Sequence, residues 1–176
     1  MPKAYEEQAF TAEGYGPGGT AVMIACVSAG ESANEMAIAA LREQVRSVLL
    51  RHGGRGGATN SVAYLFHRVG VLRCPATGRL AATAFAAGAE DVVKLPDGRV
   101  EVITDPEDLE SVRLQLQAAG HAVLAATVTR RAAQSLPLNA ADTLRLQQLT
   151  TELRALAGVE NVYTNGQIPE QFLAHV

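Results

Sequence analysis

The sequence predicts an α+β protein built around a ferredoxin-like split βαβ sandwich, with a second small α+β domain inserted into it. Its strand-like and helix-like segments follow the order β-α-β-β, then α-β-β-α-β, then α-β. The first and last pieces together give β-α-β-β-α-β, the split βαβ order. A single C-terminal helix and strand need a sheet to join, because they cannot bury both faces alone. We therefore expect a discontinuous ferredoxin-like domain of residues 1–74 plus 134–176, and an inserted α+β domain of residues 75–133.

The first strand and helix of the expected sandwich follow an opening arm. Residues up to the glycine-rich stretch 14–19 are predicted to form an extended arm and then a rigid turn. Residues 20–28 are a continuous apolar run of strand length. Residues 32–35, Ser-Ala-Asn-Glu, match a capping box, and apolar residues then recur at helical spacing. The helix is expected to end at Gly53, which suits a left-handed C-cap.

The remaining elements of the sandwich lie on both sides of the expected insertion. Residues 61–67 and 70–73 are predicted to form two short strands joined by a tight turn. After a linker at 134–138, Asn139 is expected to cap a helix that runs through Ala157. A last strand is expected at 159–164.

The inserted domain is expected to hold two helices and three strands. An alanine-rich helix at 78–89 precedes a hairpin whose strands, 92–95 and 99–104, flank the turn Pro96-Asp97-Gly98. Asp105 as a cap and Pro106 at the first position predict a second helix, which ends at Gly120. A strand is expected at 121–129.

Charge is distributed unevenly along the chain. The formal net charge is −3, yet residues 42–79 carry seven arginines against Glu43 alone. The stretches on either side, 1–41 and 80–120, are acidic. A basic central stretch therefore lies between acidic neighbours, and the excess of arginine over lysine is also compatible with an effect of genome composition. Tryptophan is absent and aromatic residues make up 5% of the chain, so stacking platforms for single-stranded nucleic acid are few.

Several classes of protein are disfavoured by the composition. No apolar run approaches the roughly 18 residues that would span a membrane, and the charged start lacks a signal peptide, so we expect a cytoplasmic protein without a membrane partner. The two cysteines, Cys26 and Cys74, lie in apolar runs and are interpreted as reduced core thiols. Without a CxxC motif or clustered histidines, we expect no metal and no cofactor.

The candidate binding residues gather at the end of the first helix and in the loop that follows it. Arg42 and Arg46 are four residues apart and therefore share one helix face. The loop His52–Gly57 is glycine-rich, and its amides, with Arg51 and Arg55, would suit a phosphate or an RNA backbone. The alternative interpretation of this loop is a solvated hinge between helix and strand. The candidate nucleic-acid-binding set is Arg42, Arg46, Arg51, His52, Gly53, Gly54 and Arg55.

No residue pattern matches a catalytic signature. The stretch Gly14–Gly19 is not a phosphate loop, because it precedes a strand and Pro17 removes an amide. The acidic pairs have no partner base or nucleophile, and the four histidines are scattered. We therefore expect a protein that is not an enzyme and has no catalytic residues.

Six motifs in order resemble the YebC family. They are Glu13–Gly19, His52–Gly54, Ser61–Phe66, Ala87–Val92, Thr104–Leu109, and Asn161–Asn165 with Ile168-Pro169. The resemblance covers residues 5 to 170 approximately. It implies two α+β domains, one inserted in the other, and a non-enzymatic role in gene expression. Bacterial members are described as DNA-binding transcriptional regulators of YebC/PmpR type, and the mitochondrial relatives, activators of cytochrome oxidase subunit one, act in translation.

The sequence departs from the family pattern in three places. We expect the chain to lack the basic, helical N-terminal domain of the family. The family's polar segment after the first strand is replaced by Ser28–Ser32, and the stretch between Gly19 and His52 is longer than usual. The missing domain removes phosphate-neutralising charge. Two functional hypotheses follow: a regulator that binds DNA, RNA or the ribosome, and a protein-interaction or ligand-sensing module that has lost nucleic-acid binding.

Overall fold

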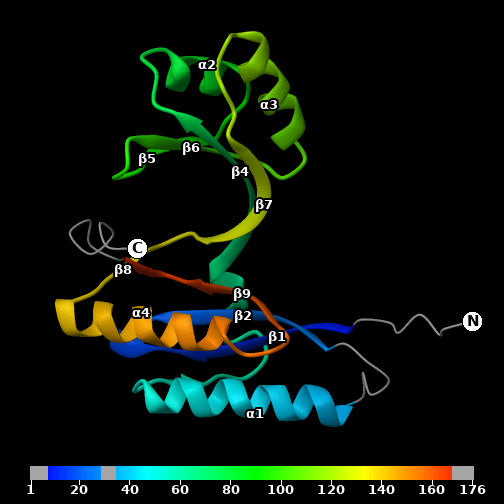
Figure 1. Cartoon of the computed structure of the whole chain (residues 1–176), viewed down its shortest axis with the longest axis vertical. Helices are drawn as coiled ribbons and strands as arrows, with labels where there is room; N and C mark the ends of the chain where they lie inside the picture. The colour runs from blue at the N-terminus through cyan, green and yellow to red at the C-terminus, as the bar shows by residue number, and fades with distance from the viewer. Residues whose placement is uncertain (1–7, 29–34, 168–176) are drawn as a thin grey trace, which may run out of the picture. The chain divides into compact units, whose positions relative to one another are not determined.

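The computed structural model describes residues 8–28 and 35–167 (Figure 1). Contacts divide them into two compact units. The first unit contains the described residues up to Phe66 together with those from Ala132, and the second unit spans His67–Arg131. Each unit has one four-stranded sheet with helices, which confirms the predicted α+β class. No helix within the described ranges is long and apolar enough to cross a membrane.

The secondary structure of the first unit begins with β1, where an extended arm was predicted. The elements of this unit are β1 (Gln8–Tyr15), η1 (Pro17–Gly19), β2 (Ala21–Ser28), α1 (Glu35–Arg51), β3 (Arg55–Gly56), η2 (Ala63–Leu65), β8 (Leu136–Pro137), α4 (Ala140–Arg154), β9 (Val159–Thr164) and β10 (Gly166–Gln167). Those of the second unit are β4 (Phe66–Pro75), α2 (Leu80–Ala86), β5 (Asp91–Lys94), β6 (Arg99–Thr104), α3 (Leu109–Ala118) and β7 (Ala125–Ala132). The predicted capping box at 32–35 lies largely outside the described residues.

The sheet of the first unit has the strand order β3-β1-β2-β9. β1 pairs antiparallel with β2, from Gln8 opposite Ser28 to Tyr15 opposite Ala21, and antiparallel with β3 on its other side. β2 and β3 are therefore parallel, joined through α1, with β1 between them. This is the split βαβ arrangement. The predicted arm was wrong, because residues 8–15 form a strand in the middle of this sheet.

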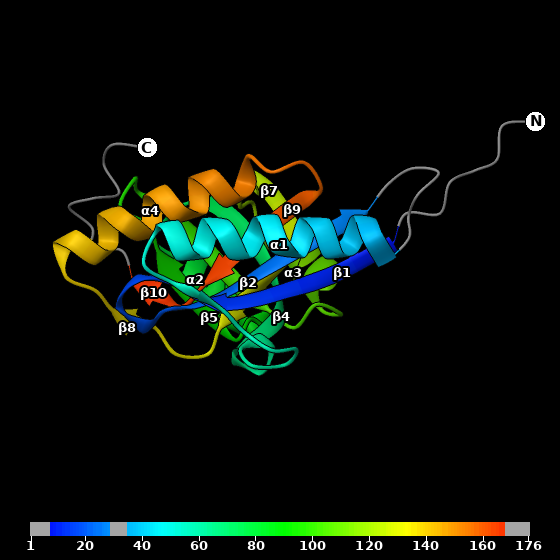
Figure 2. The same ribbon diagram turned by 90° about the horizontal axis from the view of Figure 1, so that it is seen from below.

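Both helices of the first unit cover one face of its sheet, as Figures 1 and 2 show. Apolar residues of β2 on this face pack against Leu41, Val45, Val48 and Leu49 of α1 and against Leu146, Leu149 and Leu153 of α4. The opposite face carries a smaller cluster. There Ala21 and Met23 of β2 pack against Val62 and Phe66, so the segment before β4 covers the side of the sheet that has no helix.

The second unit has a β-α-β-β-α-β sheet of its own, in the order β5-β6-β4-β7. β4 is one strand of ten residues preceded by the short turn η2. Residues 70–73 lie in a strand, as predicted, but the tight turn expected before them was wrong, and residues 61–65 are not a strand. Gly70 lies inside the strand. A glycine is needed there because a Cβ would lie 2.3 Å from Thr104 Oγ1 on the neighbouring strand. α2 and α3 bury Leu80, Val112 and Leu116 against one face of the sheet.

Local sequence signals predicted the helix ends with variable accuracy. Asn139 caps α4 as predicted, with its side chain accepting from the amide of Asp142 at 2.8 Å. Gly53, Gly88, Gly120 and Gly158 follow helices with positive φ. Asp105, however, accepts from the amide of Glu107 in a turn, and α3 begins only at Leu109. Asp105, the predicted helix cap, therefore begins a turn that precedes α3.

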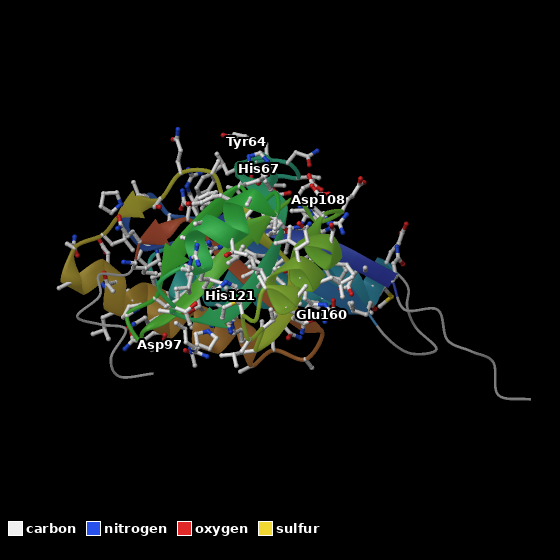
Figure 3. The ribbon with its side chains drawn as sticks, turned by 90° about the horizontal axis from the view of Figure 1, so that it is seen from above. Tyr64, His67, Asp97, Asp108, His121 and Glu160 are labelled. Atoms are coloured by element: carbon white, nitrogen blue, oxygen red, sulfur yellow. The ribbon has the colours of Figure 1, made fainter. Side chains whose placement is uncertain are left out.

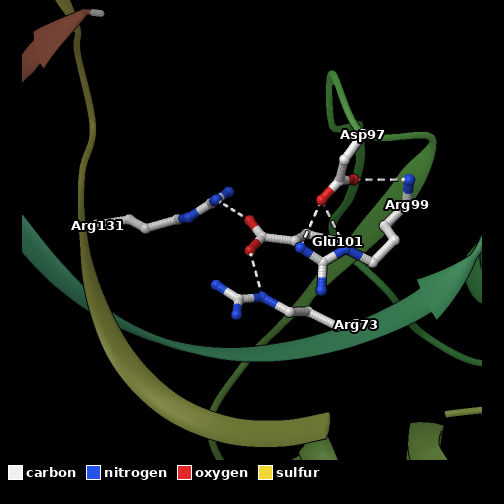
Figure 4. A network of polar contacts seen from close by, with 5 residues as sticks. All are labelled: Arg73, Asp97, Arg99, Glu101 and Arg131. Atoms are coloured by element: carbon white, nitrogen blue, oxygen red, sulfur yellow. Dashed lines mark hydrogen bonds and ion pairs between the residues drawn. The ribbon is translucent and has the colours of Figure 1, made fainter. Parts of the chain in front are cut away.

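A buried carboxylate ties three strands of the second sheet together (Figure 4). Glu101 on β6 is 4% exposed. Its carboxylate accepts from Arg73 Nε on β4 at 3.0 Å and pairs with Arg131 on β7. Both arginines keep part of their side chains in solvent. Because the charge is buried with two partners, its removal would leave two guanidinium groups facing each other.

We predict that Glu101→Gln lowers the free energy of unfolding of the second unit by about 1–3 kcal/mol, because an amide cannot accept two charge-assisted hydrogen bonds. Urea denaturation followed by circular dichroism measures the loss. The control is Asp97→Asn, which weakens the solvent-exposed pair with Arg99 and should leave the midpoint nearly unchanged. Equal losses in the two variants would contradict the prediction.

Candidate nucleic-acid interface

The glycine-rich segment after α1 forms an edge strand. Gly53, with φ of 77°, reverses the chain, and the Gly54 amide donates to Leu49 O at 2.8 Å. Arg55 and Gly56 then pair with Tyr15 and Gly14 of β1. The Gly57 amide donates to Glu13 O at 2.8 Å. These backbone hydrogen bonds contradict our expectation of free amides in this loop, so the loop is neither a phosphate cradle nor a hinge.

Two glycines are required here because main chains approach closely. A Cβ on Gly54 would lie 2.2 Å from Tyr15 O. A Cβ on Gly14 would lie 2.6 Å from Leu49 Cδ1 and 2.7 Å from Arg55 O. Any side chain at either position would separate β3 from β1 or from the end of α1. The glycines therefore keep the edge strand seated against its neighbours.

Arg42 and Arg46 lie on the exposed face of α1, as the sequence predicts. The guanidinium carbon of Arg42 is 4.9 Å from the centre of the Phe10 ring on β1, within cation–π range. Arg46 pairs with Glu43 at 4.0 Å, and both side chains are more than 60% exposed, so solvent screens this pair. The two arginines line a hollow of about 320 Å³ that includes Gly56 and Gly57.

Arg55 belongs to a different surface. Its guanidinium carbon is 4.3 Å from the centre of the Tyr15 ring. Arg55 and Tyr15 are register partners and therefore lie on the same side of the sheet. Gly56 and Gly14, one position along, face the side that α1 covers. Arg55 thus lies on the sheet face opposite to Arg42 and Arg46, although all three surround the β3 edge.

Arg51 and His52 turn toward α4. His52 Nε2 is 2.5 Å from Glu152 Oε2, and Arg51 forms an ion pair with the same carboxylate. The hydrogen bond with His52, followed by the charge of Arg51, holds the pKa of Glu152 below its ordinary value. Five of the seven predicted residues therefore form three groups: the Arg42–Arg46 hollow, Arg55 on Tyr15, and a bridge from Arg51 and His52 to α4. The other two, Gly53 and Gly54, have their amides bonded to the main chain.

Glu13 is a site residue that the sequence analysis did not single out. It lies on β1, is 7% exposed, and accepts hydrogen bonds from the amides of Asn60 at 2.7 Å, Val62 at 2.8 Å and Ala63 at 2.8 Å. Burial alone would raise the pKa of its carboxyl, but the three amides outweigh burial and hold the pKa below its ordinary value. The sequence did contain a signal for this site, because an acidic residue directly follows a short stretch that contains the apolar residues Phe10 and Ala12.

The histidines and cysteines form no metal site within the described ranges. His67 and His121 lie well apart in Figure 3, and no three metal-binding side chains gather there. Cys26 and Cys74 are free and buried, and burial raises the pKa of Cys26 to about 11. A thiol with so high a pKa carries almost no thiolate at neutral pH and is a poor nucleophile.

The fold and this interface define a module of two α+β units that presents exposed arginines around a glycine-built sheet edge. Residues 6–166 match the family model described as the second and third domain of TACO1/YebC. The chain belongs to the TACO1/YebC family. This confirms the resemblance carried by the six sequence motifs.

Relatives in several bacteria support the same assignment. A probable transcriptional regulatory protein of Methylococcus capsulatus is 39% identical over 175 residues, which cover 98% of this chain and 67% of that protein. One from Actinobacillus pleuropneumoniae is 39% identical over 164 residues, covering 92% of this chain and 64% of that protein. The chain thus spans about two thirds of the length of these curated relatives.

A solved structure has the same fold. The crystal structure of a conserved hypothetical protein from Aquifex aeolicus matches with a TM-score of 0.80 and 29% sequence identity. The match covers 98% of this chain and 70% of that chain.

We predict that Glu13→Gln lowers the free energy of unfolding by about 1–3 kcal/mol at pH 7, because a neutral amide accepts the three hydrogen bonds less well. The pKa of Glu13 is lower in the folded state, so its contribution is complete above its ordinary value of 4.5 and is lost as pH falls through the lowered value. Urea denaturation at a series of pH values should show the two proteins converging in acid. A pH-independent difference would contradict this account.

We predict that Gly54→Ala is more destabilising than Gly53→Ala. The first substitution forces a Cβ against Tyr15 O and should cost about 3 kcal/mol. The second meets no atom within 4 Å and pays only the left-handed backbone strain, about 1–2 kcal/mol. Chemical denaturation gives both values. Hydrogen exchange of the Gly57 amide should accelerate more in Gly54→Ala, and the reverse order would exclude close approach as the reason for Gly54.

Proposed function

We propose that this chain is the part of a cytoplasmic, non-enzymatic regulator of gene expression that contacts DNA, RNA or the ribosome, with its second unit a domain inserted into the first. The observation that carries the proposal is the Arg42–Arg46 hollow beside the β3 edge. Two exposed guanidinium groups one helical turn apart fit successive phosphates of a nucleic-acid backbone. Transcriptional regulation, the function in the names of the relatives, is consistent with such a contact.

Arg55 extends this surface, whereas Arg51 and His52 take no part in it. Arg42 and Arg55 are each held over an aromatic ring, which limits the side-chain entropy lost on binding. Glu152 already neutralises Arg51 and accepts from His52. We therefore assign phosphate contacts to Arg42, Arg46 and Arg55. Gly53 and Gly54 contribute by seating β3, while their amides are bonded to the main chain.

A second candidate is a protein-interaction or ligand-sensing module without nucleic-acid binding. The observation that favours it is local charge compensation. Glu43 lies beside Arg46, Glu152 beside Arg51, and the chain as a whole is acidic. A partner protein with mixed charges would fit such a surface as well as a phosphate backbone does.

We predict that the chain binds duplex DNA, RNA or purified ribosomes at low salt, and that affinity falls steeply as salt rises, because phosphate contacts release counterions. Arg42→Glu with Arg46→Glu should weaken binding by at least about tenfold and lower the log–log salt slope by about two. Fluorescence anisotropy and ribosome co-sedimentation measure both quantities.

The matched control for this experiment reverses two exposed arginines of the second unit, Arg68→Glu with Arg130→Glu. It makes the same change in net charge and should retain most of the affinity. Absence of binding to all three targets at low salt would refute the proposal and favour the second candidate. Equal weakening by the two double variants would show that net charge, and not the hollow, drives binding.

A further inference from the structure

The second unit contains an apolar hollow between α2 and the edge of its sheet. The hollow has a volume of about 470 Å³. Its walls include Leu80, Ala81 and Phe85 of α2, Val92 and Lys94 of β5, and Val100 of β6. This volume falls in the range of small-molecule sites, roughly 300–1,000 Å³. It lies within one compact unit and shares no residue with the arginine surface of the first unit.

The hollow exists because α2 is short and alanine-rich. The helix has seven residues, Leu-Ala-Ala-Thr-Ala-Phe-Ala. Leu80 and Ala84 are buried and seat the helix on the sheet, but the methyl group of Ala81 is too small to fill the space above β5. Phe85 remains 52% exposed at the rim. A large aromatic ring that is half in solvent beside an apolar hollow gains from any apolar group that covers it.

Among the described residues that line this hollow, Lys94 alone has an ionisable side chain. Within the described residues no carboxylate lies within ion-pair distance of its ammonium group, whereas Arg99 and Arg113 of the same unit are paired with Asp97 and Glu110. An unpaired ammonium beside apolar walls is complementary to an anion that carries an apolar body.

The loop before α2, which lines part of the hollow, is held in place by a chain of polar contacts. Thr77, also in the wall, lies 3.1 Å from His121 Nδ1 through its Oγ1 atom. His121 Nε2 lies 3.2 Å from Thr83 Oγ1 on α2, and Figure 3 shows where His121 lies in the second unit. The loop before α2 is thereby fixed to the helix, so the hollow is formed before any ligand arrives. A preformed site avoids the cost of ordering on binding.

We propose that this hollow binds a small organic acid, with a compact apolar body between α2 and β5 and its carboxylate on Lys94. A free small molecule fits better than a protein segment, because the hollow is bounded by one short helix and one four-residue strand. A docked helix or strand would need a longer groove. The site would add ligand sensing to the proposed contact with nucleic acid. The evidence for the site does not depend on that contact, because the two surfaces share no residue.

The test uses 4-phenylbutyrate as the probe and the whole chain as the protein. Titration followed by ¹⁵N NMR should shift the amide resonances of Ala81, Phe85, Val92 and Lys94 at millimolar concentrations. The neutral isostere 4-phenylbutanol should bind about tenfold more weakly, since it loses the charge-assisted contact. The chain has no tryptophan, so Phe85→Trp provides a single fluorescent reporter for the same titration.

Three variants separate the contributions to binding. Lys94→Met keeps the apolar stem and should abolish the preference for the acid over the alcohol. Ala81→Leu fills the hollow and should remove binding of both compounds. Arg130→Met, an exposed cation of the same unit outside the hollow, should bind as the parent chain does. Circular dichroism of each variant confirms that it is folded.

Several results would overturn the proposal. They are absence of shifts in these resonances, equal affinity for the acid and the alcohol, and unchanged binding by Ala81→Leu. A peptide ending in phenylalanine that binds more tightly than the free acid, and shifts resonances beyond the hollow, would show that a protein terminus is the occupant. None of these outcomes bears on the arginine surface, whose own salt-dependent assay tests it separately.

Discussion

The arrangement of the first unit depends on the carboxylate of Glu13. β1 is the strand that joins β2 to β3, and Glu13 points from it toward the face of the sheet without helices. A buried charge is costly unless hydrogen bonds replace its hydration. The amides of Asn60, Val62 and Ala63 provide them. This bonding fixes the segment that buries Val62 and Phe66, so one side chain of the central strand holds in place the chain that covers this face of the first sheet.

Elements with strong local signals could be predicted from the sequence, and those defined by distant contacts could not. β2 is a continuous apolar run, and α4 has an asparagine cap that bonds three residues away, so both were correct. β1 carries Glu13 and Gly14, which weaken any strand pattern, and its partners lie elsewhere in the chain. Gly70 resembled a turn residue, but it is needed for close approach to Thr104, a contact between strands that no local pattern reveals.

The same distinction applies to the candidate interface. Helical spacing correctly placed Arg42 and Arg46 on one exposed face of α1, because that geometry is local. It could not show that Glu152, 100 residues beyond His52, removes His52 and Arg51 from the surface. Nor could the glycine content of the loop show that its amides are bonded. Glycine is common both in mobile loops and in strands that pack closely against a neighbour. Only the presence of a neighbouring strand that bonds to the glycine segment distinguishes the two cases.

Both units contain a four-stranded sheet, yet their surfaces differ in ways that the fold does not dictate. In the first unit, arginines surround an edge that glycines hold close to β1. In the second, a short alanine-rich helix leaves an apolar hollow beside Lys94. The chain passes between the units twice, at Phe66–His67 and at Arg131–Ala132. In each unit a buried carboxylate bonds to a residue close to one of these points. Glu13 accepts from the amide of Val62, just before Phe66, and Glu101 pairs with Arg131. The amide of Ala133 donates to Leu65 O at 3.1 Å, so the two crossings are also joined to each other at the first unit.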